Sequence, residues 1–343
     1  MPFQAALISG GKNRFYFTGF NSSAGALLIT KSNTYFLVDF RYYEKARQTV
    51  SGAQVILCEK LYKQISEILN RENITEILLE TDIVTLADFE RLGAGLEGFK
   101  ISREETLAKN IEKLRSIKSA EEIGFIEKAQ LLTDEAFSYI LNKIKQGVTE
   151  KELALDMEFF MRSRGSEGVA FDFIVVSGRN SSLPHGVPTD KRLENGDFIT
   201  MDFGAVWNGY RSDMTRTVAL GCVTEKQKKV YETVLKAQYA ALEIIKPNVK
   251  CCEVDRVARD IITLAGYGKN FGHGLGHSVG LDIHENPACN TRDKTELLSG
   301  MIMTVEPGIY IENEFGVRIE DMVLVTENGC RNLTKSPKEL IIL

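Results

Sequence analysis

Short apolar runs alternate with helix-like segments over the first third of the chain. Runs rich in β-branched and aromatic residues have the length and composition of strands, and other segments repeat apolar residues at three- and four-residue steps. The strand-like runs are residues 5–8, 26–30, 35–38, 55–57 and 77–79, and the helix-like segments are residues 61–69 and 84–92. This alternation predicts a small α/β domain.

Two helix starts mark a change of pattern. Ser119-Ala-Glu-Glu and Thr149-Glu-Lys-Glu each have the form of a capping box, in which a hydroxyl and a carboxylate satisfy the first free backbone N–H groups of a helix. Apolar residues recur at helical spacing after both boxes. The sequence therefore predicts helices over residues 119–147 and 149–165.

Beyond Gly168 the pattern consists of strands and glycine-rich loops with two further helices between them. The helices are expected over residues 224–245, ahead of Pro247, and over residues 252–265. The strand-like runs are residues 171–177, 301–306, 309–311, 317–320 and 322–325. We expect this region to be an α+β domain.

Residues 198–220 have the pattern of a β-hairpin whose turn is Asn208-Gly209, the dipeptide best suited to a type I′ turn. The register that follows opposes Trp207 with Tyr210, Gly204 with Asp213, and Asp202 with Thr215. Asp202 and Asp213 then share one face as diagonal neighbours, with Cβ atoms about 7 Å apart. Two carboxylates that close repel unless a proton or a cation lies between them. The alternative is that one aspartate caps a turn and the other is solvated.

Length and composition bound the remaining choices. A chain of 343 residues is long enough for two domains, and we place their boundary in the charged, irregular stretch 99–114. The predicted domains are residues 1–110 and 111–343. A net charge of −5 and a pI of about 5.6 give no general attraction to nucleic acid or to anionic lipid, so neither partner is expected.

The cysteines and the apolar runs predict the cellular compartment in which the protein works. No run approaches the length of a membrane span, and the first residues lack the charged segment of a secretory signal. The six cysteines contain no Cys-x-x-Cys pair, and the adjacent Cys251 and Cys252 are poor disulfide partners. We expect reduced thiols in a cytoplasmic protein.

All four histidines fall in the second predicted domain, beside the acidic hairpin: His185, His273, His277 and His284. Taken singly, each is more often a hydrogen-bonded structural histidine than a ligand, but the group predicts a site. The glycines around His273 and His277 each disfavour a helix by about 1 kcal/mol. We therefore expect these two histidines on a strand or loop, on one side of the chain, where the glycines allow close approach.

Two glutamates add to this set. Glu306 lies at the end of an expected strand, before Pro307-Gly308, and Glu320 lies within another, where alternation places it on the same side as Arg318. A buried glutamate needs a partner, which could be Arg318 alone or a pair of metal ions shared with the aspartates. Carboxylates and one imidazole without thiolates favour Mn²⁺, with Co²⁺, Fe²⁺ or Zn²⁺ as alternatives.

Taken together, these residues resemble the creatinase-type (pita-bread) metallopeptidase family, in particular its proline-directed members, aminopeptidase P and prolidase. In the second domain the resemblance is carried by Ser-Gly-Arg-Asn-Ser-Ser-Leu-Pro-His-Gly (177–186), Gly-Tyr-Arg-Ser-Asp-Met-Thr-Arg-Thr (209–217), His-Gly-Leu-Gly-His (273–277), Gly-Leu-Asp-Ile-His-Glu-x-Pro (280–287), Thr-Val-Glu-Pro-Gly-Ile-Tyr (304–310) and Gly-Val-Arg-Ile-Glu-Asp (316–321). In the first it is carried by residues 17–20 and 35–42. It implies a creatinase-like α/β domain followed by a pita-bread catalytic domain with a curved antiparallel sheet.

The resemblance also implies a site. The expected ligands of two divalent ions are Asp202, Asp213, His277, Glu306 and Glu320, with Asp213 and Glu320 touching both ions. His185, His273 and His284 would line the substrate side and act with Glu306 in catalysis, and Tyr310 and Arg318 would support the ligands and the pocket. The family also implies a homodimer.

The expected activity is hydrolysis of the bond between an N-terminal residue and a following proline, by a water that bridges the two ions and passes its proton to Glu306. Dipeptide-selective relatives can carry an arginine directly after His-Glu-x-Pro, where this chain has Ala288, so the main expectation is an Xaa-Pro aminopeptidase. The alternatives are an Xaa-Pro dipeptidase and a non-catalytic module that binds peptides or proteins on the same fold.

Overall fold

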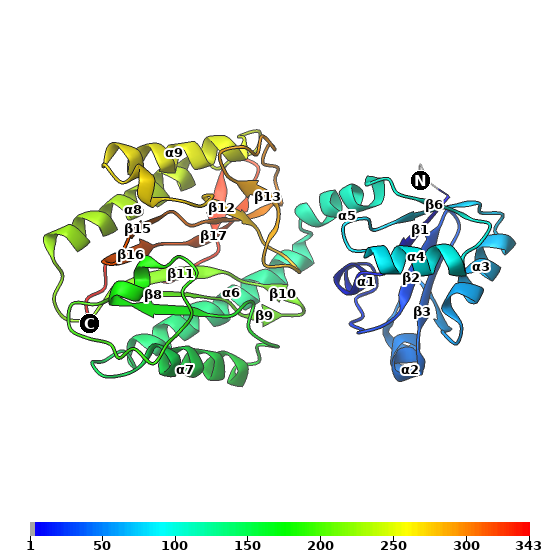
Figure 1. The fold of residues 1–343 in the computed structure, drawn as a ribbon, viewed down its shortest axis with the longest axis horizontal. Coiled ribbons are helices and arrows are strands. Elements are labelled where there is room, and N and C mark those ends of the chain that lie inside the picture. Colours follow the sequence, from blue (N-terminus) through cyan, green and yellow to red (C-terminus); the bar gives the residue numbers. More distant parts are fainter. Residues whose placement is uncertain (1–3) are drawn as a thin grey trace. The chain divides into compact units, whose positions relative to one another are not determined.

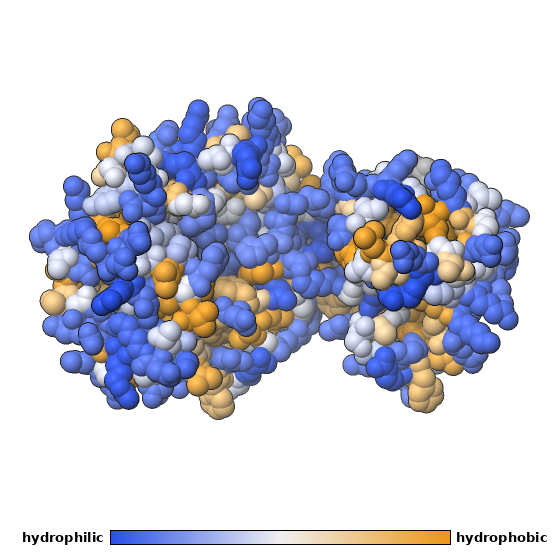
Figure 2. Space-filling view, in the orientation of Figure 1, coloured by the Kyte–Doolittle hydropathy of each residue, from blue (hydrophilic) through white to orange (hydrophobic). Residues whose placement is uncertain are grey.

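The computed structural model describes residues 4–343, and the chain divides into two compact units, the first ending at Leu114 and the second beginning at Arg115 (Figure 1). Each unit has its own sheets and its own apolar core. On the face shown in Figure 2, hydrophilic residues cover most of both units, with smaller hydrophobic groups between them. Within the described residues, no helix is both long and apolar enough to span a membrane.

The first unit is built on a six-stranded sheet with the strand order β4-β3-β2-β1-β5-β6. Its strands are β1 (Ala5–Ile8), β2 (Ala26–Thr30), β3 (Thr34–Val38), β4 (Gln54–Leu57), β5 (Glu76–Leu79) and β6 (Lys100–Ser102). The first three are antiparallel, whereas β4, β5 and β6 run parallel to their neighbours. The five strands expected from the sequence are all present, and β6 was not predicted.

Helices cover both faces of this sheet, which explains why its strands are apolar at successive positions. The helices are α1 (Gly11–Thr18), α2 (Phe40–Thr49), α3 (Leu61–Arg71), α4 (Leu86–Gly95) and α5 (Thr106–Ser116). Leu7 of β1 packs in the core beneath α3 and α4, whereas its neighbour Ile8 packs in the core of the opposite face, which α2 and α5 cover.

The expectation of an irregular stretch at residues 99–114 was wrong, because this stretch contains β6 and most of α5. In α5, Leu107 and Ile111 are buried in the core, one turn apart, among many charged residues. Two apolar positions are too few to give a recognisable helical period. The helices α1 and α2 were also not predicted, and each buries few aliphatic side chains.

The second unit opens with two helices that pack on a three-stranded antiparallel sheet with the order β11-β8-β7. These elements are α6 (Ala120–Leu141), α7 (Glu150–Ser163), β7 (Ile174–Ser177), β8 (Phe198–Phe203) and β11 (Met214–Ala219). Both predicted capping boxes are confirmed, at Ser119 and Thr149. However, α6 ends at Leu141 rather than at Gly147. The following turns bury Ile144 in the same core, which extends the apolar period beyond the helix.

The predicted hairpin register is confirmed. The short strands β9 (Val206–Trp207) and β10 (Tyr210–Arg211) pair Trp207 with Tyr210, and Asp202 of β8 pairs with Thr215 of β11. The turn residues Asn208 and Gly209 have φ values of +48° and +75°, as a type I′ turn requires.

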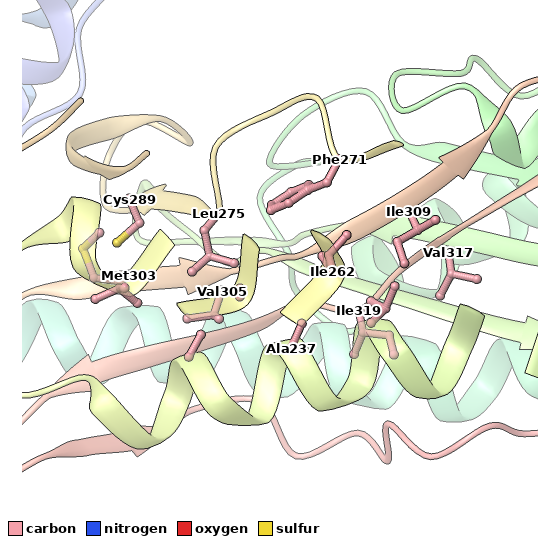
Figure 3. Close-up of a cluster of buried hydrophobic side chains, with 14 of the residues drawn as sticks. Ala237, Ile262, Phe271, Leu275, Cys289, Met303, Val305, Ile309, Val317 and Ile319 are labelled. Atoms are coloured by element: carbon pink, nitrogen blue, oxygen red, sulfur yellow. The ribbon is translucent and has the colours of Figure 1, made fainter. Parts of the chain in front are cut away.

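The remaining strands form a five-stranded sheet, β13-β12-β14-β17-β18, and a separate ribbon of β15 and β16. They are β12 (Gly276–Ser278), β13 (Glu285–Cys289), β14 (Ile302–Val305), β15 (Gly308–Ile311), β16 (Phe315–Arg318), β17 (Asp321–Val325) and β18 (Cys330–Asn332). Two helices, α8 (Glu225–Ile244) and α9 (Cys251–Leu264), pack on them through one large core. Figure 3 shows Ala237 and Ile262 of these helices facing Val305 and Ile319 of the strand region.

Glu320 does not lie within a strand, so that expectation was wrong. Residues 319–320 link β16 to β17, at the point where the chain leaves its pairing with β15 and begins to pair with β14. In this link the N–H of Glu320 donates to the carbonyl of Thr215 on β11, at 3.1 Å. At the point where the chain changes its strand partner, this hydrogen bond therefore attaches Glu320 to the hairpin that carries Asp202 and Asp213.

A buried ion cluster holds this junction from behind. The Arg216 guanidinium donates to the Asp321 carboxylate at 2.7 Å and to the backbone carbonyls of Thr215 and Glu320. The Lys338 ammonium donates to the second oxygen of Asp321 at 2.6 Å. Arg216 and Asp321 are almost fully buried, so the cations depend on this carboxylate for their charge balance.

We predict that Asp321→Ala lowers the free energy of unfolding by about 3–5 kcal/mol, because two buried cations lose their partner. Urea denaturation of the purified protein measures this change. Asp260→Asn, on the exposed side of α9, is the matched control and should leave stability unchanged. A loss below about 1 kcal/mol for Asp321→Ala, in the range of an exposed ion pair, would contradict this role.

Candidate metal centre

The five predicted ligands come from distant parts of the second unit and line one cavity. Two are supplied by the hairpin, one by a short strand of the five-stranded sheet, and two by segments at strand ends: Asp202 on β8, Asp213 ahead of β11, His277 on β12, Glu306 after β14 and Glu320 before β17. The cavity has a volume of about 800 Å³.

Their polar atoms are close together. The Nε2 atom of His277 lies 3.6 Å from an Asp213 oxygen and 3.4 Å from a Glu306 oxygen. Ligand atoms of Asp213, His277 and Glu320 all lie within 4.8 Å of one another. One cation could contact these three groups at once, so the geometry permits a metal site.

Hydrogen bonds determine which nitrogen of His277 faces the carboxylates. Its Nδ1 atom lies 3.1 Å from the carbonyl oxygen of Ser278, so Nδ1 carries the proton and donates. The lone pair of Nε2 then points to the acidic side. Burial, with a smaller contribution from His284, lowers the pKa of His277 to about 4, which keeps the imidazole neutral at physiological pH. A neutral imidazole is the form that binds metals.

Burial shifts the pKa values of three of the carboxyl groups in the opposite direction, upward. Burial, with the nearby carboxylates of Glu320 and Asp202, raises the pKa of Asp213 well above its ordinary value. Burial likewise raises the pKa of Glu320, to which Glu306 and Asp202 contribute. For Glu306, burial and Asp202 raise the pKa to about 8. Without a cation Glu306 would keep its proton near pH 7, and a bound cation would displace that proton.

Two carboxylate oxygens test whether a metal fits. Oδ1 of Asp202 and Oε1 of Glu320 are buried and have no hydrogen-bond partner among residues 4–343. Buried oxygens normally accept a hydrogen bond, but no described residue donates one to these two oxygens. A hard divalent cation binds carboxylate oxygens, and these two oxygens have lone pairs that no hydrogen-bond donor occupies. The residues present therefore fit a metal centre.

Arg318 supports the site from beneath but does not neutralise Glu320. Its guanidinium donates to Asp202 at 2.7 Å and to the Thr215 hydroxyl at 3.0 Å. Glu320 instead accepts from Thr215, at 2.7 Å. The alternative in which Arg318 alone balances Glu320 was therefore wrong, since the ion pair is made with Asp202.

Tyr310 and His273 continue this network. Arg318 donates to the Tyr310 hydroxyl at 2.8 Å, and that hydroxyl lies 3.0 Å from Nε2 of His273. Nδ1 of His273 lies 2.8 Å from the carbonyl of Gly274, so it is the donor and Nε2 accepts from Tyr310. His273 lines the cavity, but both of its ring nitrogens have protein partners. This leaves it less able to contact a substrate than the sequence suggests.

The other two histidines have freer positions. His185 and His284 are exposed and line the cavity, and the His284 ring lies 4.4 Å from that of His277, centroid to centroid. Both can therefore reach a bound molecule. The expectation that His273 and His277 do not form a helical pair is confirmed, because His277 lies on β12.

Close backbone contacts explain part of the glycine pattern. A Cβ atom on Gly276 would lie 2.0 Å from the carbonyl oxygen of Thr304, so only glycine lets β12 approach β14 here. A Cβ atom on Gly280 would lie 2.6 Å from the Glu285 carboxylate. These two positions confirm the prediction of close approach around His277.

Sequence reasoning missed four residues that the structure brings to the site. The hydroxyl of Thr215 connects Arg318 with Glu320, and the hydroxyl of Thr304 accepts from the backbone N–H of His277 at 3.0 Å. Asp172 and Arg292 line the cavity. The only sequence signal for Thr215 is its position opposite Asp202 in the hairpin.

Comparison with known proteins gives two family matches. Residues 124–327 match the model of metallopeptidase family M24, and residues 3–117 match the creatinase/prolidase N-terminal domain. A solved structure described as an Xaa-Pro dipeptidase from Bacillus anthracis superimposes with a TM-score of 0.96 at 40% identity, covering 100% of this chain and 96% of that chain.

Two further relatives are similar over almost their whole length. An Xaa-Pro dipeptidase from Pyrococcus horikoshii is 40% identical over 98% of this chain and 94% of its own. The structure of an X-Pro aminopeptidase from Thermotoga maritima has a TM-score of 0.94 at 37% identity and covers 100% of this chain and 98% of that chain. The expected fold class is confirmed, and the chain belongs to metallopeptidase family M24, with a creatinase/prolidase N-terminal domain ahead of its pita-bread hydrolase domain.

Proposed function

We propose that this metallopeptidase is an Xaa-Pro dipeptidase, which hydrolyses the bond between an N-terminal residue and a C-terminal proline. The observation that carries the proposal is the cluster of Asp213, His277 and Glu320, whose ligand atoms lie within 4.8 Å of one another in the lining of a cavity. The chain that holds this cluster is similar to Xaa-Pro dipeptidases over almost its whole length.

An Xaa-Pro aminopeptidase, the main expectation from the sequence, is the second candidate. It is supported by the similarity to the Thermotoga maritima aminopeptidase and by Ala288, which lines the cavity without a charge. The non-catalytic alternative has no support, since the chain belongs to a metallopeptidase family and all five predicted ligands line one cavity.

Together, five residues would hold two divalent cations: Asp202, Asp213, His277, Glu306 and Glu320. The metal that we expect is Mn²⁺, with Co²⁺, Fe²⁺ or Zn²⁺ as alternatives. Such ions, when bound, polarise a peptide carbonyl and make a nearby water more acidic. Mn²⁺ is favoured because most of these donors are carboxylates.

Glu306 is the proposed proton carrier. One of its oxygens lies 3.4 Å from Nε2 of His277 and accepts a hydrogen bond from the Thr304 hydroxyl at 3.3 Å, and the side chain lines the cavity. It can take the proton of the attacking water and return it to the proline nitrogen, which must be protonated to leave. His185 and His284, at the exposed side of the cavity, can donate hydrogen bonds to the peptide and to the developing oxyanion.

Arg318 has a positioning role in this proposal. One of its nitrogens donates to Asp202, and another donates to the carbonyl of Pro184, the residue before His185, at 3.1 Å. One side chain therefore connects a proposed ligand with the loop that carries a proposed substrate contact.

Location and assembly remain predictions. All six cysteines are free thiols, which suits the expected cytoplasm. We also retain the homodimer that the family resemblance implies. The proposed partner is a small peptide with proline in second position.

We predict that His277→Ala and Glu306→Gln each lower kcat/KM for Leu-Pro with Mn²⁺ by about 10²- to 10⁴-fold, the range for loss of a catalytic proton carrier or its support. Elemental analysis should show reduced metal in His277→Ala. Glu243→Gln, exposed on α8, is the matched control. Turnover that survives dialysis against a chelator and both substitutions would exclude the proposed mechanism.

Metal affinity is predicted to rise with pH between about 6 and 8. The pKa of Glu306 in the cation-free site is about 8, so a proton must leave before the carboxylate binds a cation, whereas His277 is already neutral. The affinity should rise by up to about tenfold per pH unit for each proton displaced. Isothermal titration calorimetry with Mn²⁺ in buffers of different ionisation enthalpy measures the metal affinity and the number of protons released. A pH-independent affinity would contradict the proposed ligation.

Stability of the metal-free protein should change in the opposite direction. A folded-state pKa of about 8 for Glu306, above its ordinary value, stabilises the fold below the unfolded pKa, and this contribution is lost as pH rises through about 8. Melting temperature without metal should therefore fall between pH 6 and pH 8.5, and Glu306→Gln should reduce the slope. An unchanged slope in this variant would show that Glu306 is not the group responsible.

Substrate length distinguishes the two candidate activities. An Xaa-Pro dipeptidase should have a kcat/KM for Leu-Pro at least about tenfold above that for Leu-Pro-Gly, which corresponds to about 1.4 kcal/mol. Initial rates on both peptides at matched Mn²⁺ give the ratio. A ratio below one would instead favour the Xaa-Pro aminopeptidase.

A further inference from the structure

We propose that Glu150 is a positioning residue, which places His185 at the cavity by holding both ends of the loop that carries it. The loop comprises residues 178–188, between Ser177 at the end of β7 and Thr189. This inference rests on the proposed peptidase function, in which His185 contacts the substrate. It adds a buried residue that keeps this contact in place.

Glu150 is a buried carboxylate without a cation. It is the first residue of α7, its exposed fraction is 0%, and it forms no ion pair with any residue in the part of the chain that the structure describes. A buried charge of this kind is costly unless hydrogen bonds satisfy it, although the first turn of a helix favours a negative charge. The position of this carboxylate therefore depends on the groups that donate to it.

Both ends of the loop supply these donors. One oxygen of Glu150, Oε1, accepts from the N–H and the hydroxyl of Ser177, at 2.7 and 2.9 Å. The other oxygen, Oε2, accepts from the N–H and the hydroxyl of Thr189, at 3.0 and 2.6 Å. The side-chain amide of Asn180 donates to both oxygens, at 3.1 and 3.3 Å. Each oxygen thus holds one end of the loop, and a single carboxylate connects the two ends.

The position of His185 depends on the backbone of this loop. The imidazole is exposed, lines the cavity and has no hydrogen bond with any of residues 4–343. Arg318 donates to the carbonyl of Pro184 at 3.1 Å. The N–H of Gly316 donates to the hydroxyl of Ser181 at 2.9 Å. Both of these contacts come from β16 and hold the middle of the loop, whereas the carboxylate on α7 holds its ends.

A glutamine in place of Glu150 would hold only one end of the loop. The backbone N–H groups of Ser177 and Thr189 can only donate, and the side chain of glutamine has one accepting oxygen and one donating nitrogen. That nitrogen would face one of the two N–H groups. Glu150→Gln therefore releases one end with almost no change in volume. Glu150→Asp keeps both accepting oxygens but is one methylene shorter.

The kinetic test is a double-mutant cycle between Glu150→Gln and His185→Ala, with Leu-Pro as the substrate and Mn²⁺ as the metal. Glu150→Gln alone should lower kcat/KM by about 10- to 30-fold and His185→Ala by about 100-fold. The double variant should lose no more than His185→Ala alone, because the loop then carries no histidine to position. Glu150→Asp should recover part of the loss. Losses that multiply in the double variant, or no loss in Glu150→Gln, would overturn the proposal.

Two measurements without turnover distinguish positioning from a general structural role. The affinity for Mn²⁺ should differ from that of the wild type by less than about twofold in Glu150→Gln, because His185 is not a proposed metal ligand. Amide hydrogen exchange of the metal-free variant should accelerate in residues 177–189 and remain unchanged in the hairpin, residues 198–217. Faster exchange throughout the second unit together with weaker Mn²⁺ binding would overturn the positioning role.

Glu121→Gln is the matched control, because it removes the same charge from the first turn of α6 at an exposed position. It should change neither kcat/KM nor hydrogen exchange. If Glu150→Gln does not fold, Glu150→Asp enters the same cycle with a smaller expected loss. If wild-type protein with Mn²⁺ cleaves no Xaa-Pro substrate, the proposed function fails. Hydrogen exchange still tests the loop in that case, since unchanged exchange in residues 177–189 of the Glu150 variants would overturn this inference by itself.

Discussion

Mutual repulsion among buried carboxylates is the constraint on which the second unit depends. Asp202, Asp213, Glu306 and Glu320 line the same cavity, and burial raises the pKa of three of them. A protein that places acids this way must supply protons or cations to balance them. The unpartnered oxygens of Asp202 and Glu320 indicate that cations are the balance for which the site is built.

The architecture brings these acids together by joining separate sheets at one place. The hairpin carries two aspartates on one face, and the link between β16 and β17 places Glu320 where its backbone bonds to Thr215 of that hairpin. Arg216 holds the same junction from the side opposite the cavity, through carbonyls of both segments. Stability and site geometry are therefore connected, because the buried Arg216–Asp321 pair supports the backbone that positions a proposed ligand.

Local signals predicted much of this arrangement, and long-range packing accounts for what they missed. Asn208-Gly209 defines the hairpin register, so the shared face of Asp202 and Asp213 follows from the sequence. Glu320 was expected within a strand, because a change of strand partner has no local signature. The roles of Thr215 and Thr304 depend on residues about a hundred and about thirty positions away, so spacing alone gives no sign of them.

The central claim is that four carboxylates and one imidazole hold two divalent cations. Its most direct test is the anomalous diffraction of crystals grown with Mn²⁺. The account predicts two manganese peaks roughly 3.5–4 Å apart, in contact with Asp202, Asp213, His277, Glu306 and Glu320. A cavity without manganese, or ions bound elsewhere while these side chains keep their protons, would contradict it.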